Sequence, residues 1–479
     1  MADDIIDSRG RFWSAEITVP KGHFAPEESV TGRMRLKANG RTELDLDATI
    51  ELTASKDAVH RIMAYEGVEG AICGFLIDAN KHVRLTGLSS NGGSLGGMGP
   101  IRERLIAEQC LVSREPFKPG VEPRFRWLDL PLDGYEPWLG RGNINVTKGK
   151  RRIKADYALH PKIIRWPSPT MPIELRRDLR GDGGRALTAL AWHESAFLRL
   201  GFPNGNLRVE EAIEHSQRVE DLLVLMADHD KRLDYGLLRR TRGGKPVELY
   251  FSRAGRENAA NLEWHKAWVL FEACRGEFGE IVRSWLSNYE TYGAGFHLYL
   301  GNRRGQAMYP EHRFASLMWG LEALHRALVP AESNDKQGAK VARILNEISR
   351  KKDREWAARF LPEVSEPSLA NRLADLFSRI DLGIGKNEIT EFAQRCAARR
   401  NDVSHFGGQR EPGGYEAFLE DIVSLNRAVD LLYHAMILKI VGIPEPLVRH
   451  RFIGGPKSYV ARKILAHCGL EMMPDATDA

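Results

Sequence analysis

The chain has 479 residues, of which 43% are hydrophobic and 28% are charged, a composition typical of a soluble globular protein with two or three domains. The formal net charge of +5 is too small to indicate a polyanionic partner by itself, although 49 of the 69 basic residues are arginines, whose planar cation matches phosphate. No apolar tract is long enough to span a bilayer, so we expect no membrane association.

The chain begins Met-Ala-Asp-Asp, without the basic and apolar regions of a signal peptide, and we therefore expect a cytoplasmic protein. Its five cysteines form no CxxC motif and no Cys/His cluster. This spacing argues against a disulfide framework or a zinc site and favours buried thiols. We expect neither a metal nor a cofactor.

Residues 1–165 are expected to form a β-rich domain, because apolar and polar residues alternate in short runs separated by turn residues. Short strands are expected at 14–19, 43–52, 71–77, 82–88 and 125–130. An antiparallel sandwich or barrel would follow from this pattern. The Gly- and Ser-rich run 89–99 lacks the Gly-Lys-Ser/Thr ending of a phosphate-binding loop, and we interpret it as a surface loop.

The strongest local basic cluster is the run 148–154, which contains Lys150, Arg151 and Arg152. A hairpin or linker exposed to solvent is the preferred interpretation of this run. Contact with the backbone of RNA is the alternative.

Residues 166–304 are expected to be a mixed α/β continuation and linker, with a helix at 209–226 and a short strand at 247–251. From residue 305 to 470 the periodicity becomes helical, and apolar residues recur every three or four positions. Helices are expected at 311–329, 338–361, 368–380, 387–406, 418–436 and 457–467. The fold class predicted is therefore α+β and multidomain, with a β-rich N-terminal domain followed by an all-α bundle.

Arg400 and His405 form an Arg-x4-His pair at the end of the helix predicted at 387–406. An arginine offers a permanent cation for phosphate, and a histidine transfers protons near neutral pH. The pair therefore suggests metal-independent cleavage of RNA. Composition alone predicts roughly 1.5 such pairs by chance, and the second pair, Arg462 and His467, lies in an ordinary apolar helix.

Context separates the two pairs. Asn401 follows Arg400 directly, Gly407 and Gly408 can end the helix, and long amphipathic helices flank the segment. At about 100° per residue, Arg400 falls inside the apolar stripe of its helix, where a cation is costly unless a carboxylate, a second subunit or a phosphate meets it. His405 lies about 140° further round, so the two side chains meet only if the helix distorts or if two copies share one cleft. A helix-end ion pair with a C-terminal cap is the structural alternative.

These segments resemble the HEPN family of domains (higher eukaryotes and prokaryotes nucleotide-binding). Residues 400–405 match its Arg-x4-6-His motif, with the frequent polar residue after the arginine present as Asn401. The stretch Leu-Glu-Ala-Leu-His at 321–325 is similar to the first helix of the Apea-like branch. That branch joins a β-rich N-terminal domain to a C-terminal HEPN bundle in bacterial abortive-infection proteins, which is the order expected here.

The resemblance implies an endoribonuclease that disables a phage-infected host cell, acts as a homodimer or higher homo-oligomer, answers a phage-derived trigger, and cleaves RNA such as tRNA. The 2′-hydroxyl would attack the phosphate and leave a 2′,3′-cyclic phosphate. His405 would be the acid or base, Arg400 would stabilise the developing charge, and Asn401 would orient a phosphate oxygen or the imidazole.

Four further residues have supporting assignments. Glu322 is expected to hold Arg400 at rest, and His325 is expected to reach the motif helix. Asp402 could tune the site, and Arg399 could bind RNA.

Two other functions are compatible with this sequence. The first is a non-catalytic HEPN module that binds a nucleotide or a partner protein. The second is an enzyme that uses carboxylates and magnesium, for which we find no clustered Asp/Glu motif. We also hypothesise that the N-terminal domain senses the trigger or restrains a toxic nuclease.

Overall fold

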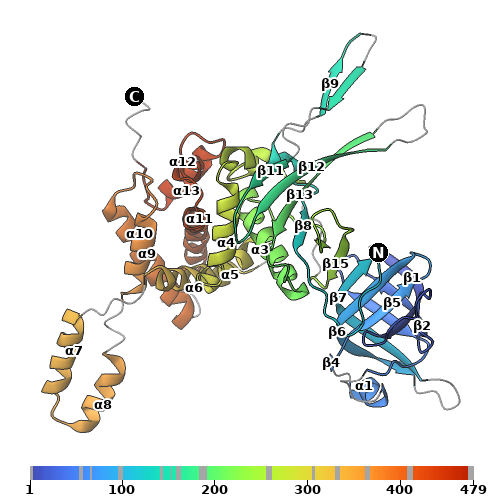
Figure 1. Cartoon of the computed structure of the whole chain (residues 1–479). Coiled ribbons are helices and arrows are strands. Elements are labelled where there is room, and N and C mark those ends of the chain that lie inside the picture. Colours follow the sequence, from blue (N-terminus) through green and yellow to red (C-terminus); the bar gives the residue numbers. More distant parts are fainter. Residues whose placement is uncertain are drawn as a thin grey trace. The chain divides into compact units, whose positions relative to one another are not determined.

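The computed structural model describes the chain except residues 1–3, 53–57, 65–66, 95–100, 141–143, 151–152, 158–162, 183–190, 255–260, 305–307, 330–334, 362–366, 407–413 and 473–479. The chain folds into two compact units (Figure 1). The β unit comprises residues 1–137, 141–220 and 231–261, and the helical unit comprises residues 138–140, 221–230 and 262–479.

Six strands of the β unit close into an antiparallel barrel. They are β1 (Ile6–Ser14), β2 (Val30–Leu36), β3 (Thr42–Leu46), β5 (Ile72–Leu76), β6 (Lys81–Ser94) and β7 (Arg102–Ser113). The order is β7-β3-β2-β1-β5-β6, and the pairing of β6 with β7 completes the circle. Alternate side chains such as Phe12, Met34, Leu44 and Leu105 fill the interior, which explains why these segments show period-two hydrophobicity.

Strand β7 is long enough to belong to both the barrel and a second set of strands. Its residues Glu103–Ala107 pair with β3, and Gln109–Val112 pair with β15. Beyond β15 (Val247–Phe251) the sheet continues in the order β14 (Leu237–Arg239), β8 (Trp127–Pro131), β13 (Ala191–Gly201), β12 (Ile173–Asp182) and β11 (Ile163–Trp166). The remaining strands and helices of this region are β4 (Gly67–Val68), α1 (Ala58–Ala64), α2 (Glu136–Leu139), α3 (Val209–Ala227) and the hairpin β9 (Ile144–Lys148) with β10 (Ile153–Tyr157).

Three predictions for the β unit were wrong in detail. The strand expected at 14–19 ends at Ser14, where the N–H of Ile17 donates to the carbonyl of Ser14 at 3.0 Å in a turn. The strand expected at 43–52 ends at Leu46. The loop expected at 89–99 is a strand up to Ser94, because β7 offers a pairing partner across a bulge; the described residues resume only after residue 100.

The helical unit contains ten α-helices among the residues that the structure describes. After two 3₁₀ turns at Trp264–Lys266 and Phe271–Cys274 come α4 (Phe278–Asn288), α5 (Gly293–Arg303), α6 (Pro310–Leu328), α7 (Asp335–Glu347), α8 (Lys351–Phe360), α9 (Leu369–Ser378), α10 (Lys386–Phe406), α11 (Tyr415–Ile440), α12 (Glu445–Arg449) and α13 (Ser458–His467). The single helix expected at 338–361 is two helices. None of the described helices is long and apolar enough to cross a membrane.

The chain is thus an N-terminal β-rich region with a six-stranded barrel and a C-terminal helical region, as the fold class predicted. The predicted domain boundaries at 165 and 304 stay predictions. Strands continue to Phe251, the uninterrupted series of helices α4 to α13 begins at Phe278, and the segment 221–230 belongs to the helical unit.

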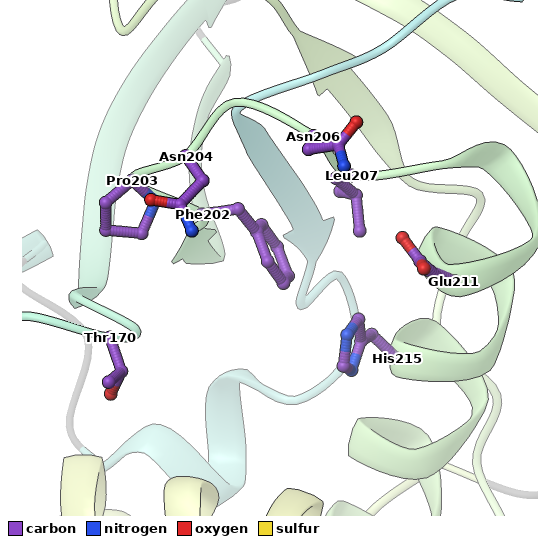
Figure 2. A pocket seen from close by; sticks show the side chains of 8 residues that line it. All are labelled: Thr170, Phe202, Pro203, Asn204, Asn206, Leu207, Glu211 and His215. Atoms are coloured by element: carbon purple, nitrogen blue, oxygen red, sulfur yellow. The ribbon is translucent and has the colours of Figure 1, made fainter.

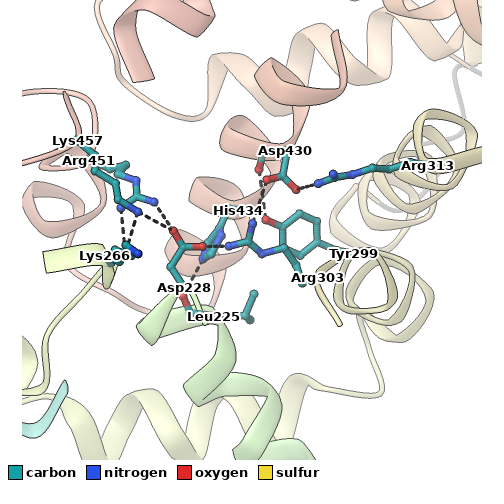
Figure 3. A network of polar contacts seen from close by, with 10 residues as sticks. All are labelled: Leu225, Asp228, Lys266, Tyr299, Arg303, Arg313, Asp430, His434, Arg451 and Lys457. Carbon is teal, nitrogen blue, oxygen red and sulfur yellow. Dashed lines mark hydrogen bonds and ion pairs between the residues drawn. The ribbon is translucent and has the colours of Figure 1, made fainter. Parts of the chain in front are cut away.

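Two half-buried aspartates tie the helical unit together (Figure 3). Asp228 receives the guanidinium groups of Arg303 and Arg451. Asp430 on α11 forms ion pairs through Oδ2 with Arg303 Nη1 at 3.1 Å and through Oδ1 with Arg313 Nη2 at 3.3 Å. Because each carboxylate meets two cations from different segments, the network fixes α5, α6, α11 and the segment 221–230 relative to one another.

Asp129 on β8 is the centre of a buried ion cluster in the β unit. Its carboxylate accepts hydrogen bonds from Arg199 Nη2 at 2.6 Å and from Arg239 Nε at 2.9 Å. Arg199 and Asp129 are almost fully buried, so the loss of either partner leaves an uncompensated charge in the sheet.

We predict that Asp129→Asn lowers the free energy of unfolding by about 3 to 5 kcal/mol, because the buried Arg199 loses its counter-charge. Urea-induced unfolding of the full chain measures this change. The matched control is Asp45→Asn, which breaks a 2.7 Å pair with Arg35 on the partly exposed barrel surface, where a loss below about 1 kcal/mol is expected. Equal losses in the two variants would contradict the assignment.

Candidate functional site

Helix α10 carries the Arg-x4-His pair and is unbroken from Lys386 to Phe406. Ile389, Phe392, Ala393 and Cys396 are buried on one face, and this face packs against α9 and α6. Five residues of regular α-helix correspond to about 140° of rotation. Arg400 and His405 of one chain therefore leave the helix in clearly different directions.

Arg400 is half-buried at the contact between α10 and α6. One quarter of its side chain is exposed, and its Nη2 lies 4.0 Å from Oε2 of Glu322 on α6. Its Nη1 donates to Oδ1 of Asn401 at 3.4 Å. Its Nε is buried and has no hydrogen-bond partner, and the exposed quarter of the side chain is the part that an anion can reach.

Glu322 therefore lies where the sequence placed it, within reach of Arg400. Its carboxylate is shared, because Oε1 also accepts from Arg326 Nη2 at 3.2 Å one turn along α6. The 4.0 Å separation is longer than a hydrogen bond. At this contact Arg400 is held by charge attraction alone. An approaching phosphate can therefore take the place of the Glu322 carboxylate.

The other residues of the motif face outward or serve the helix itself. Asn401 and His405 are exposed in the last two turns of α10. Asp402 is buried and accepts from Arg399 Nη1 at 3.3 Å. An exposed imidazole at a helix end is accessible to substrate, as a general acid or base requires.

Arg399 joins α10 to α11. Its Nε donates to Asp421 at 2.6 Å, and this hydrogen bond raises the pKa of the guanidinium. Arg395 donates to the other oxygen of Asp421 at 2.9 Å. RNA binding by Arg399 stays a prediction, but two carboxylates already balance its charge.

The expectation that His325 reaches the motif helix was wrong. Its Nε2 lies 3.3 Å from Asp375 and its Nδ1 lies 3.2 Å from Arg372, both on α9. Desolvation by burial lowers the pKa of His325. The imidazole therefore links α6 to α9 through two polar contacts.

The predicted basic cluster lies on the hairpin formed by β9 and β10. Lys150 is exposed next to the turn, which agrees with the solvated hairpin that we preferred. Arg151 and Arg152 lie outside the described residues. Contact of this hairpin with RNA stays a prediction.

All five cysteines are buried thiols, as expected. Among the described residues, no group of three or more His, Cys, Asp or Glu side chains is arranged to hold a metal ion.

The sequence did not predict a cavity of about 210 Å³ in the β unit (Figure 2). Thr170, Phe202, Asn204, Glu211 and His215 contribute to its lining. The rings of Phe202 and His215 lie 5.1 Å apart, and Nδ1 of His215 is buried without a hydrogen-bond partner. The signal in the sequence was the turn Pro203-Asn204-Gly205-Asn206 before a helix.

Residues 316–447 match the family model described as Apea-like HEPN. The match extends from α6 into α12 and includes Glu322, Arg400 and His405. No curated protein and no solved structure matches the chain.

The imidazole of His215 should make the protein less stable in acid. Burial lowers its pKa to about 4, against about 6.5 in an unfolded chain. Between these values the unfolded state binds more protons, so stability falls as the pH drops from about 6.5 to about 4. The contribution is about 2 to 3 kcal/mol at the acid end.

We predict that His215→Gln loses less stability than the wild type when urea unfolding is compared at pH 7.5 and at pH 4.5. His23→Gln, at an exposed position, is the control and should retain the full acid sensitivity. An unchanged pH dependence in His215→Gln would show that the buried imidazole does not titrate in this range.

Proposed function

Since residues 316–447 form an Apea-like HEPN domain, a family of ribonucleases often found in defence systems, we propose that this protein is a metal-independent endoribonuclease of bacterial anti-phage abortive infection. Its substrate is RNA, with tRNA as the first candidate. The observation that carries the proposal is Arg400, a half-buried guanidinium whose Nε has no partner and whose nearest carboxylate is 4.0 Å away.

The reaction needs a base, an acid and a cation near one phosphate. An imidazole of His405 takes the proton of the 2′-hydroxyl, and the oxygen attacks the adjacent phosphorus. Arg400 stabilises the charge on the phosphorane, and Asn401 holds a phosphate oxygen or the imidazole. The bond to the 5′-oxygen breaks, that oxygen takes up a proton, and a 2′,3′-cyclic phosphate remains. DNA lacks the 2′-hydroxyl and resists.

The regular geometry of α10 favours a site built from two copies. In one chain, Arg400 and His405 are separated by about 140° around the helix axis. A two-fold axis near the end of α10 would place His405 of one copy beside Arg400 of the other. We therefore propose a homodimer, or a higher homo-oligomer built from such dimers, as the active form.

The role of the β unit stays a hypothesis. A β-rich unit that senses a phage-derived trigger, or restrains the nuclease, would keep a toxic activity silent. Truncation is a poor test of restraint, because a cut at residue 300 removes α4, most of α5 and the segment 221–230, all of which belong to the helical unit. Restraint is better tested by substitutions within the full chain.

A non-catalytic HEPN module is the second candidate, and one observation favours it. Within a single chain the predicted base and the predicted cation do not converge, since α10 remains helical past His405. A monomer would therefore bind nucleotides or a partner protein without cleaving RNA. Overexpression separates the two functions, because only an active nuclease slows growth in a way that His405→Ala removes.

We predict that Arg400→Ala and His405→Ala each reduce RNA cleavage at least about 100-fold, because each removes a group that acts on the phosphate. Purified protein is incubated with total tRNA in EDTA, and fragments and their end groups are determined. The matched controls are Arg462→Ala and His467→Ala, the second Arg-x4-His pair, which lies exposed on α13. Cleavage by Arg400→Ala or His405→Ala at the wild-type rate would reject this site.

We further predict that mixing the two inactive variants restores activity. When Arg400→Ala and His405→Ala chains exchange subunits, half of the dimers are mixed, and each mixed dimer has one complete site. About a quarter of wild-type activity is expected. A mixture that stays inactive, although subunit exchange is verified by mass measurement, would show that each site comes from one chain.

A further inference from the structure

Helices α7 and α8 form a hairpin inside the HEPN match, between α6 and α9 (Figure 1). Among the described elements, α7 and α8 have their main contacts with each other. The guanidinium of Arg354 closes the turn, because Nε and Nη2 donate to the carbonyl of Ile348 at 3.0 and 2.8 Å. The hairpin is therefore a defined element.

The inner face of the hairpin is a small apolar contact. Val341, Ile344 and Leu345 of α7 are half-buried, and Ala357 is the one buried side chain of α8. This contact leaves large aromatic side chains outside it. Trp356 is 65% exposed and Phe360 is 51% exposed, and their ring centroids lie 5.0 Å apart. One turn of helix separates the two rings, so they form a continuous aromatic surface.

The same segment carries an excess of positive charge. Residues 335–360 contain eight Lys and Arg against four Asp and Glu, a net charge of +4. Lys340, Arg343, Lys352 and Arg359 are exposed and make no ion pair with any residue that the structure describes. Lys352 and Arg359 lie within about 60° of Trp356 around the axis of α8, so cations border the aromatic surface.

We propose that the α7–α8 hairpin is a binding arm for single-stranded RNA and that Trp356 and Phe360 stack on bases while Lys352 and Arg359 contact phosphates. The inference deepens the proposed function, on which it rests. Stacking on aromatic side chains and contact of cations with phosphates are the two interactions that single strands use. Two copies of the hairpin repel each other by charge, which disfavours self-association through this surface.

The arm is separate from the catalytic groups. None of its residues belongs to α10, and Arg400 and Glu322 make their contacts with each other and with neighbours on α10 and α6. Substitutions on the arm should therefore weaken RNA binding and raise KM, while kcat changes little. A catalytic role would instead lower kcat.

The test is made on the full chain with His405→Ala, so that bound RNA stays intact. Binding of a labelled oligouridine of about 15 nucleotides is followed by fluorescence anisotropy. Adding Trp356→Ala and Phe360→Ala together should weaken binding at least about tenfold, and Trp356→Phe should retain it. Lys352→Glu with Arg359→Glu should reduce the slope of log affinity against log salt by about 1.4.

Helix α13 offers the matched control, because Tyr459 is 71% exposed and Arg462 and Lys463 are exposed beside it. Tyr459→Ala with Arg462→Glu should leave RNA affinity unchanged. Circular dichroism verifies that every variant is folded. The inference would be overturned if the His405→Ala protein bound RNA no more tightly than the variant that also carries Trp356→Ala and Phe360→Ala. It would also be overturned if the His405→Ala protein bound no RNA.

The outcomes distinguish the arm from the nuclease. RNA cleavage that depends on His405 but not on Trp356 and Phe360 leaves the proposed function intact and rejects the arm. RNA binding that depends on the arm, without cleavage by the wild type, supports the arm and rejects the nuclease. Loss of dimers in the arm variants with RNA affinity unchanged, or binding of the hairpin only to vesicles with anionic lipid, also rejects the arm.

Discussion

The regularity of helix α10 is the constraint on which the functional interpretation depends. An α-helix that continues from Lys386 to Phe406 holds residues five apart at about 140° around its axis. Arg400 thereby turns toward α6 and Glu322, and His405 stays exposed. The proposed chemistry needs both groups at one phosphate, and the proposed dimer would supply the second helix.

Most arginines whose contacts are described serve the structure and not a ligand. Arg303 and Arg451 share Asp228, Arg395 and Arg399 share Asp421, and the Asp129 cluster of the β unit follows the same pattern. Planar guanidinium groups suit such shared carboxylates, which have little or no exposure. The high arginine content therefore says little about RNA. Exposed cations that border exposed rings are found on the α7–α8 hairpin.

The two units alternate along the chain. The segment 221–230 is part of the helical unit although it lies within helix α3 and the turn after it, between stretches of the β unit. Asp228 in this segment has a left-handed backbone, with a φ of 52°, and bonds to Arg303 and Arg451. The ion network of the helical unit thus includes a segment that lies between stretches of the β unit in the sequence.

Period and spacing in the sequence were sufficient to predict the long amphipathic helices, the β-then-α order and the placement of Arg400 on a core-facing stripe. These are local properties, since 3.6-residue periodicity reports which face of a helix is buried. Tertiary structure decided what local pattern does not contain. The glycine-rich run at 89–94 became a strand only because β7 lies beside it, and Gly93 is required because a Cβ there would lie 2.3 Å from the carbonyl oxygen of Arg102. His325 contacts α9 instead of α10, and the rings of Phe202 and His215 lie side by side in the lining of a cavity. Tertiary packing selects such partners, and local sequence patterns do not contain them.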